Sequence, residues 1–252
     1  MENSPFYFNL MDEKKESALG FLVESVLKSR IKLGLQDDPN HSSDEDVNIY
    51  LAFLLLEASY PAYTERIRQL TSPRNTDIFK MIEDSQDNYF KYVVYKTNAD
   101  HLLLLLSIFQ NMGVEGRGES SFFDKSQSSY EGYAKTYYQF ASEYDRLLHR
   151  KVTALGIILA KLSQSFALYE QILMNVREAY LKFLQTREEQ FSQFLKELDG
   201  LKELFRLKEK QDLFLDTYST YLKTRDPALK EKLFEIGKEL EHLDPSFRMP
   251  HL

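Results

Sequence analysis

Apolar side chains recur every three or four residues along this 252-residue chain, and this spacing constrains its fold more than any other feature. The clearest stretch is a heptad-like series, called the seam below: Leu155, Leu159, Leu162, Phe166, Tyr169, Leu173, Val176, Tyr180 and Phe183. Residues three and four apart lie on one face of a helix, whereas a half-buried strand alternates at every second residue. The seam therefore predicts a long helix that packs against another helix.

The rest of the chain also favours helices, because it has only 9 glycines and 7 prolines to interrupt them. Gly34, Pro61 and the pair Asp226-Pro227 are expected helix boundaries. Similar apolar spacing predicts helices over about 12–33, 43–60, 62–72, 75–95, 98–112, 209–223 and 226–242, with an almost unbroken helical stretch over 122–199. We therefore predict an all-α protein, a multi-helix bundle with a long helical or coiled-coil-like arm.

The same pattern suggests three parts. Residues 1–150 are predicted to form an N-terminal helical bundle, residues 151–208 a long amphipathic helix or helical hairpin, and residues 209–252 a C-terminal helix pair packing on the bundle. The apolar spacing loses phase near Arg187, which fits either a stutter in one helix or the corner of a hairpin. A single helix from Leu155 to Phe205 would extend about 75 Å and would need a partner, such as a second copy of the chain.

Composition excludes several classes of function. The net charge of −7 disfavours nucleic-acid binding, which needs a basic face. The absence of cysteine excludes disulfides and thiolate chemistry, and the sequence shows no signal peptide. The leucine run from Leu102 to Leu106 is too short to span a bilayer and predicts a helix buried on nearly every side. We therefore expect a cytoplasmic protein with no nucleic-acid or membrane partner.

The order of segments resembles an uncharacterised all-helical family of bacterial proteins. The family's YLxxLL-type helix is matched by DEDVNIYLAFLLLEA, its GDxxLxxxGxF-like helix by NADHLLLLLSIF, and its LYxxWLxT-like helix by FLDTYSTYLKTRDPALKEKLFEIG. The chain departs from the family pattern at Ala99, where glycine is usual, and at Tyr221, where tryptophan is usual. The resemblance implies an all-helical fold and a bacterial source, and it implies no activity.

Chemistry-bearing residues form no recognisable catalytic pattern. The chain has no nucleophile motif and only one ExxH, so we predict no catalytic residues, no metal site and no cofactor. Asp145 and His149 are four residues apart and are expected to meet on one helix face, beside a solvated Arg150-Lys151. Asp100 and His101 precede the leucine run and are possible ligand-binding residues, although Asp100 also suits a first-turn carboxylate.

Sixteen tyrosines and no tryptophan suggest boundaries where a ring packs and its hydroxyl reaches a polar group. The tyrosine stripe, Tyr130, Tyr133, Tyr137 and Tyr144, suits either a core edge or a docking face. We predict a non-enzymatic protein-interaction, assembly or regulatory protein, alternatively a bundle that binds a small ligand or metal in its interior. The expected partner-binding residues are Tyr130, Tyr133, Tyr137, Tyr144, Leu162, Phe166, Tyr169, Leu173 and Tyr180, which would contact a protein partner or a second copy through the long helix.

Overall fold

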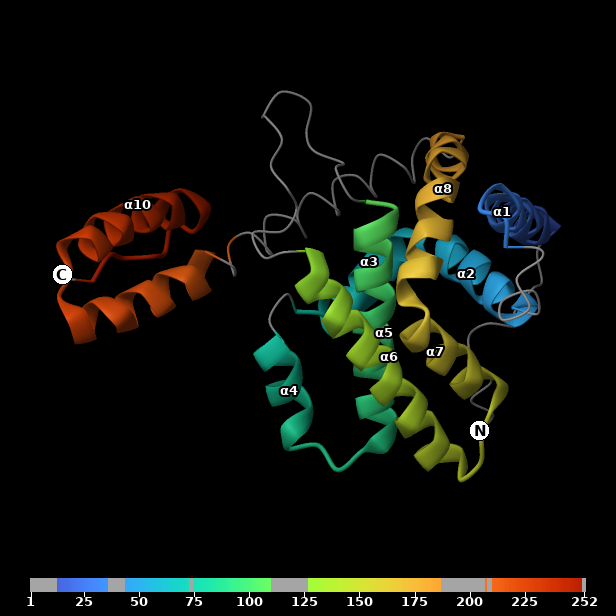
Figure 1. Cartoon of the computed structure of the whole chain (residues 1–252), viewed down its shortest axis with the longest axis horizontal. Coiled ribbons are helices and arrows are strands. Elements are labelled where there is room, and N and C mark those ends of the chain that lie inside the picture. Colours follow the sequence, from blue (N-terminus) through green and yellow to red (C-terminus); the bar gives the residue numbers. More distant parts are fainter. Residues whose placement is uncertain are drawn as a thin grey trace.

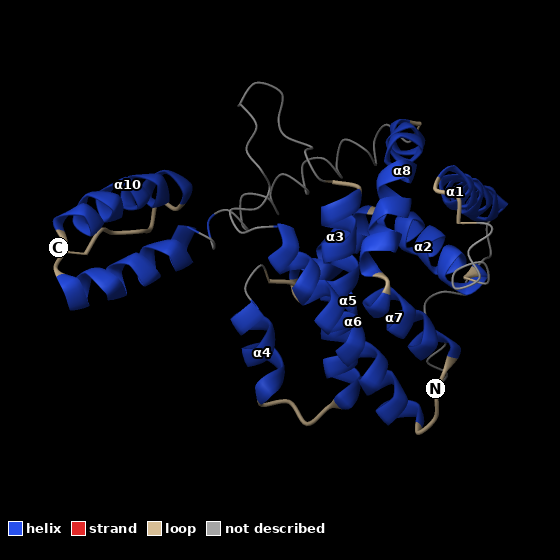
Figure 2. Ribbon diagram, viewed as in Figure 1, coloured by secondary structure: helices blue, strands red, loops and turns tan. Residues whose placement is uncertain are grey.

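A computed structural model describes residues 13–35, 44–72, 75–109, 127–186, 207 and 210–250. Figure 1 shows the course of the chain, and Figure 2 shows only helices joined by loops and turns in its described parts. The predicted all-α multi-helix architecture is therefore confirmed for these residues. Residues 187–206 of the expected arm lie outside the described residues.

The first helices follow the sequence pattern closely. Helix α1 covers Glu13–Lys32, α2 Glu45–Ala58, and α3 Pro61–Arg68. Gly34 has a φ of +69°, the left-handed conformation that a glycine adopts readily after a helix. Pro61 is the first residue of α3, where its missing N–H has no helical partner to lose. The predicted boundaries at Gly34 and Pro61 are thus confirmed.

The next two helices differ from the prediction. Helix α4 covers Asn75–Glu83, and α5 runs without a break over Asn88–Ser107. The expected division between helices 75–95 and 98–112 is wrong, because the chain turns at residues 84–87 instead. Asp87 caps α5 by accepting a hydrogen bond of 2.8 Å from the Tyr89 N–H. Asp100 consequently lies deep inside α5, so its predicted first-turn role is also wrong.

Helix α5 forms the centre of the hydrophobic core. Its C-terminal half is buried on all sides, and the residues from Leu102 to Leu106 are each at most 6% exposed. It packs against α6 (Gln127–His149) and also contacts α8 (Phe166–Gln185). The leucine run is therefore core, as predicted. No helix in the described ranges combines the length and apolar character needed to cross a membrane.

The seam is divided between two helices instead of continuing through one. Helix α6 ends at His149, α7 covers Ala154–Gln164, and α8 begins after Ser165. Apart from half-buried Leu155 and Phe183, the seam residues are fully buried in the same hydrophobic cluster as α1 to α6. The almost unbroken helical stretch expected over 122–199 is interrupted at residues 150–153 and at Ser165 in its described part, and the long arm is not confirmed.

A second hydrophobic cluster lies in the C-terminal part of the chain. A helix over residues 210–224 and α10 (Pro227–Leu243) form a hairpin that shares a small core. Asp226 caps α10 by accepting from the Ala228 N–H, as the sequence predicts. Met249 packs directly over Gly237. The division of the chain at 150/151 and 208/209 and the docking of this pair on the bundle stay predictions.

Candidate functional site

Asp100 lies in a buried hydrogen-bond network that joins three helices. Its Oδ1 accepts from Tyr50 on α2 at 2.6 Å and from Tyr138 on α6 at 2.8 Å, and its Oδ2 accepts from Lys96 at 2.6 Å. Lys96 also lies over the Tyr50 ring, 5.1 Å from its centroid. A buried carboxylate with three donors is electrostatically compensated. This network accounts for Asp100 as a structural residue.

His101 is also buried among the chain's own helices. Burial lowers its pKa to about 4, so the imidazole is neutral near pH 7. Nothing in the structure brings His101 and Asp100 together around a ligand. In the ranges that the structure describes, no three His, Asp or Glu side chains gather closely enough to hold a metal ion. The prediction that these two residues bind a ligand stays a prediction.

The tyrosine stripe on α6 faces α5 instead of solvent. Tyr130 and Tyr137 are buried, while Tyr133 and Tyr144 are half-buried. The Tyr95 ring on α5 lies 5.8 Å from both the Tyr137 and the Tyr144 ring centroids. Burial, with Tyr144 nearby, raises the pKa of Tyr95 to about 12. Tyr130 and Tyr137 therefore lie in the core, whereas docking at the half-buried Tyr133 and Tyr144 stays a prediction.

The predicted partner-binding residues of the seam lie inside the bundle. Tyr169 donates to Asp44 Oδ2 at 2.8 Å, and Tyr180 donates to the Leu55 carbonyl oxygen at 2.9 Å. The other three are fully buried as well: Leu162, Phe166 and Leu173. The chain's own helices cover all five in this structure, and their contact with a partner stays a prediction.

A network around Asp44 connects the N-terminal helices to α7 and α8. Lys161 on α7 forms ion pairs with Asp44 at 3.1 Å and Asp46 at 2.9 Å. Burial alone would lower the pKa of Lys161, but its hydrogen bonds to the two carboxylates raise it above its ordinary value. Arg30 on α1 donates to Asn48 at 3.3 Å. Sequence spacing gave no sign of this network, because its members are far apart in the chain.

The turn from α6 to α7 is held by several short contacts, and we call residues 142–157 the α6–α7 corner. Thr153 donates to Asp145 Oδ2 and accepts from the Gly156 N–H at 2.9 Å, which caps α7. Ser142 donates to the Gly156 carbonyl oxygen at 2.8 Å. His149 Nδ1 lies 3.3 Å from Asp145 Oδ1, which confirms the predicted meeting of these residues.

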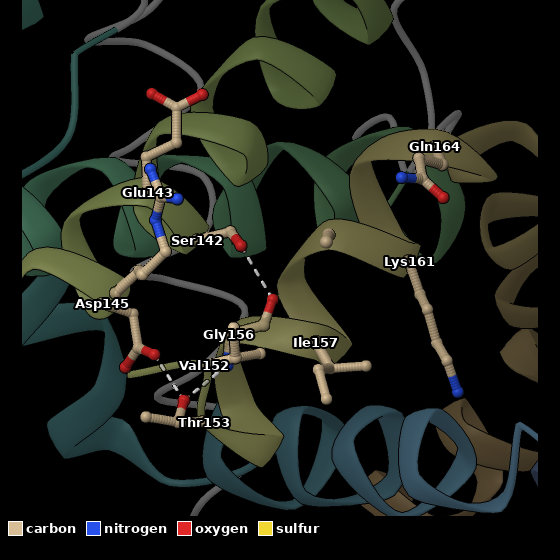
Figure 3. Close-up of a pocket in the computed structure, with 11 residues that line it drawn as sticks. Ser142, Glu143, Asp145, Val152, Thr153, Gly156, Ile157, Lys161 and Gln164 are labelled. Carbon is tan, nitrogen blue, oxygen red and sulfur yellow. Dashed lines mark hydrogen bonds between the residues drawn. The ribbon is translucent and has the colours of Figure 1, made fainter. Parts of the chain in front are cut away.

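A pocket of about 400 Å³ lies along this corner, between α6 and α7. Figure 3 shows the Ser142–Gly156 and Asp145–Thr153 hydrogen bonds on one side, and Ile157 on the first turns of α7. Lys161 lines the far end, where its amine extends toward α2 and the carboxylate of Asp46. The pocket is a concavity on the surface of the bundle, and neither Asp100 nor His101 lines it.

Large apolar side chains are exposed around this pocket. Val152 is 68% exposed, Leu147 is 54% exposed and Ile157 is 45% exposed, and Val152 and Ile157 line the pocket itself. Clustered exposed apolar side chains commonly mark interaction sites, whereas single ones need no explanation. The sequence analysis did not predict this cluster. Val152 lies in the four-residue turn between α6 and α7, and the heptad spacing gave no sign of that turn.

Three exposed cations lie close in the chain to these apolar residues: Arg146, which lines the pocket, and Arg150 and Lys151, which precede Val152. None of the three forms an ion pair with a residue in the described part of the chain. Arg150 has a φ of +53°, a left-handed conformation that is costly for a residue with a Cβ. The corner thus combines a concave pocket, exposed apolar side chains, unpaired positive charge and one strained residue.

In its described residues the chain is all-helical, and the α6–α7 corner is a candidate docking surface. The chain matches no protein-family model, no curated protein and no solved structure. Its resemblance to the bacterial family stays a prediction, and its function has to be inferred from its own geometry.

Proposed function

We propose that this chain is a non-enzymatic protein-interaction protein and that its partner docks at the α6–α7 corner. The observation that carries the proposal is a pocket of about 400 Å³ that exposed Val152 and Ile157 line, with exposed Leu147 on the last turn of the adjoining α6. Covering apolar surface stabilises a complex by about 25 cal/mol per Å² before the costs of association are subtracted. Binding of a partner protein is the simplest way to cover this apolar surface.

The corner is also suited to binding because its backbone is already fixed. Thr153 and Ser142 hold the first turn of α7 against α6, and Gly156 allows the close approach of the two helices. A preformed surface loses little conformational entropy when a partner binds. The strained Arg150 supports the proposal further, because backbone strain is concentrated at functional sites.

A homodimer through the seam is not part of this proposal, since Leu162, Phe166 and Leu173 are covered by the chain's own helices. A second candidate function is binding of a small, mainly apolar ligand in the pocket. It is favoured by the pocket volume, which lies in the range of about 300–1,000 Å³ that is usual for ligand sites. Both candidate functions use the α6–α7 corner. The molecular mass of the bound species distinguishes a protein partner from a small ligand.

The experiment is quantitative co-purification from cells of the source organism. The tagged chain is compared with a Val152→Glu/Ile157→Glu variant and with a Leu27→Glu/Ile31→Glu variant, whose two α1 side chains are also exposed. We expect at least one protein to be lost only from the corner variant. If each variant retains the same proteins as the parent chain, the proposed docking site is wrong.

A further inference from the structure

We infer, on the basis of the proposed function, that the partner segment is an acidic amphipathic helix. Its apolar side chains would contact Val152 and Ile157, and its carboxylates would pair with Arg146, Arg150 and Lys151. The inference rests on charge complementarity, because these three exposed cations form no ion pair with a described residue.

The local charge contrasts with that of the whole chain. The chain carries a net charge of −7, and other cations are already paired, including Lys161 at the far end of the pocket. Lys96 pairs with Asp100 at 2.6 Å, and Lys161 pairs with Asp46 at 2.9 Å. The corner is where unpaired cations coincide with exposed apolar side chains and a pocket. Such a surface attracts a segment that supplies carboxylates together with apolar anchors.

The two acids that line the pocket do not reverse this preference. Asp145 is 2% exposed and accepts a hydrogen bond from Thr153. Glu143 accepts from Gln139 at 3.0 Å, and Figure 3 shows its carboxylate directed away from Thr153 and Gly156. Residues 142–157 thus hold three cationic side chains against two acidic ones, of which only Glu143 is exposed.

A helix suits the shape of the surface better than a lipid bilayer does. The pocket is concave and accepts a protruding side chain, as grooves that bind amphipathic helices do. Recognition of anionic lipid typically uses clusters of about four to eight cations, and the net charge of −7 opposes approach to an anionic surface. We therefore assign the corner to a protein segment, with a membrane as the competing outcome.

The test is a display selection with a library of helix-forming peptides that vary in charge and apolar spacing, performed on the intact chain. We expect enrichment of peptides that combine Asp or Glu with apolar residues at three- and four-residue spacing. The strongest such peptide is then measured by fluorescence anisotropy. Its binding should weaken when the salt concentration rises from about 0.05 M to about 0.5 M.

Two charge-reversal variants distinguish binding at the corner from a general effect of net charge. Arg150→Glu/Lys151→Glu should weaken binding of the selected peptide at least about tenfold. Lys232→Glu/Lys238→Glu changes the net charge equally with two exposed α10 residues, and it should leave the affinity within about twofold. Circular dichroism of each variant confirms that the bundle is folded. Equal loss in both variants would overturn the inference.

Other results of the peptide selection and of vesicle binding also test the acidic-helix inference. Enrichment of basic or uncharged peptides at the corner would overturn the acidic assignment while leaving the proposed docking function intact. Failure to enrich any peptide, together with corner-dependent binding to vesicles containing phosphatidylserine, would assign the corner to a membrane. Failure of both probes would overturn the inference, and the co-purification experiment would then decide the proposed function independently.

Discussion

A Cβ atom at position 156 would lie 2.8 Å from Oδ2 of Asp145, closer than real Cβ atoms approach other atoms. Gly156 is therefore the residue that allows α7 to start directly against α6. At this contact Thr153 donates a hydrogen bond to Asp145, and the adjacent Val152 is 68% exposed. The geometry of the candidate docking surface depends on this one close approach.

Substitution Gly156→Ala should destabilise the bundle by about 1–3 kcal/mol, because the added methyl forces α7 away from Asp145. Gly132→Ala is the matched control, since a Cβ at this exposed α6 position meets nothing within 4 Å. The control should stabilise the chain by about 0.5–1 kcal/mol through higher helix propensity. Urea unfolding of both variants measures the difference. A neutral effect at position 156 would contradict the inferred close contact.

Replacement of Arg150 by glycine should stabilise the chain by about 0.5–1 kcal/mol, because glycine adopts a positive φ without steric cost. The same replacement should weaken peptide binding at the corner, because it removes a cation. Arg150→Ala is the control: it loses the charge and keeps the strain, so it should weaken binding with no gain in stability. Thermal unfolding and anisotropy measured on the same samples test both effects.

The Asp100 network predicts a strongly non-additive pair. Asp100→Leu should cost about 3–5 kcal/mol, because it leaves the ammonium of Lys96 without its carboxylate at a position where that side chain is only 12% exposed. Lys96→Met added to the first substitution should restore part of the loss. A double-mutant cycle by chemical unfolding gives the coupling energy. Strictly additive costs would show that the ion pair contributes little.

His101 predicts a pH dependence of stability with a definite sign. Its pKa is about 4 in the folded chain and about 6.5 in the unfolded chain, so the unfolded state binds the proton first as the pH falls. Stability is therefore complete above about pH 6.5 and falls between about pH 6.5 and pH 4, by roughly 2 kcal/mol on reaching pH 5.

The comparison for this prediction is His101→Leu, which removes the buried imidazole. Urea unfolding at pH 7 and pH 5 should show a smaller pH-dependent loss in the variant than in the parent chain. His149 and His242 are exposed and present in both proteins, so their contributions cancel. Identical pH dependence in the two proteins would show that His101 is not buried in its neutral form.

The fold was predictable where a local signal determines the structure. Gly34, Pro61 and Asp226 mark helix boundaries because each acts through its own backbone or side chain. The leucine run was recognisable as core because it is apolar on every side of a helix. The missed boundary at Asp87 is also local, since an aspartate N-cap precedes α5, but apolar residues on both sides of it masked the signal.

The functional interpretation was harder to obtain from the sequence. Periodicity predicted one apolar helix face along Leu162, Phe166 and Tyr169, but it does not indicate what covers that face. In the structure the covering elements come from the same chain: Tyr169, for example, reaches Asp44, which lies 125 residues away. The corner differs because Leu147, Val152 and Ile157 are five residues apart, which is not a helical period, and Val152 and Ile157 meet at the pocket only through the turn.

Site-specific photo-crosslinking tests the central claim most directly. A photoreactive phenylalanine analogue is placed at Val152 and, as the control, at Ile31, which is 54% exposed on α1. We predict a discrete protein adduct in source cells from position 152 only, and its loss when Lys151 and Arg150 are changed to Glu. Equal labelling from both positions, or an adduct from position 31 alone, would contradict the assignment of docking to the α6–α7 corner.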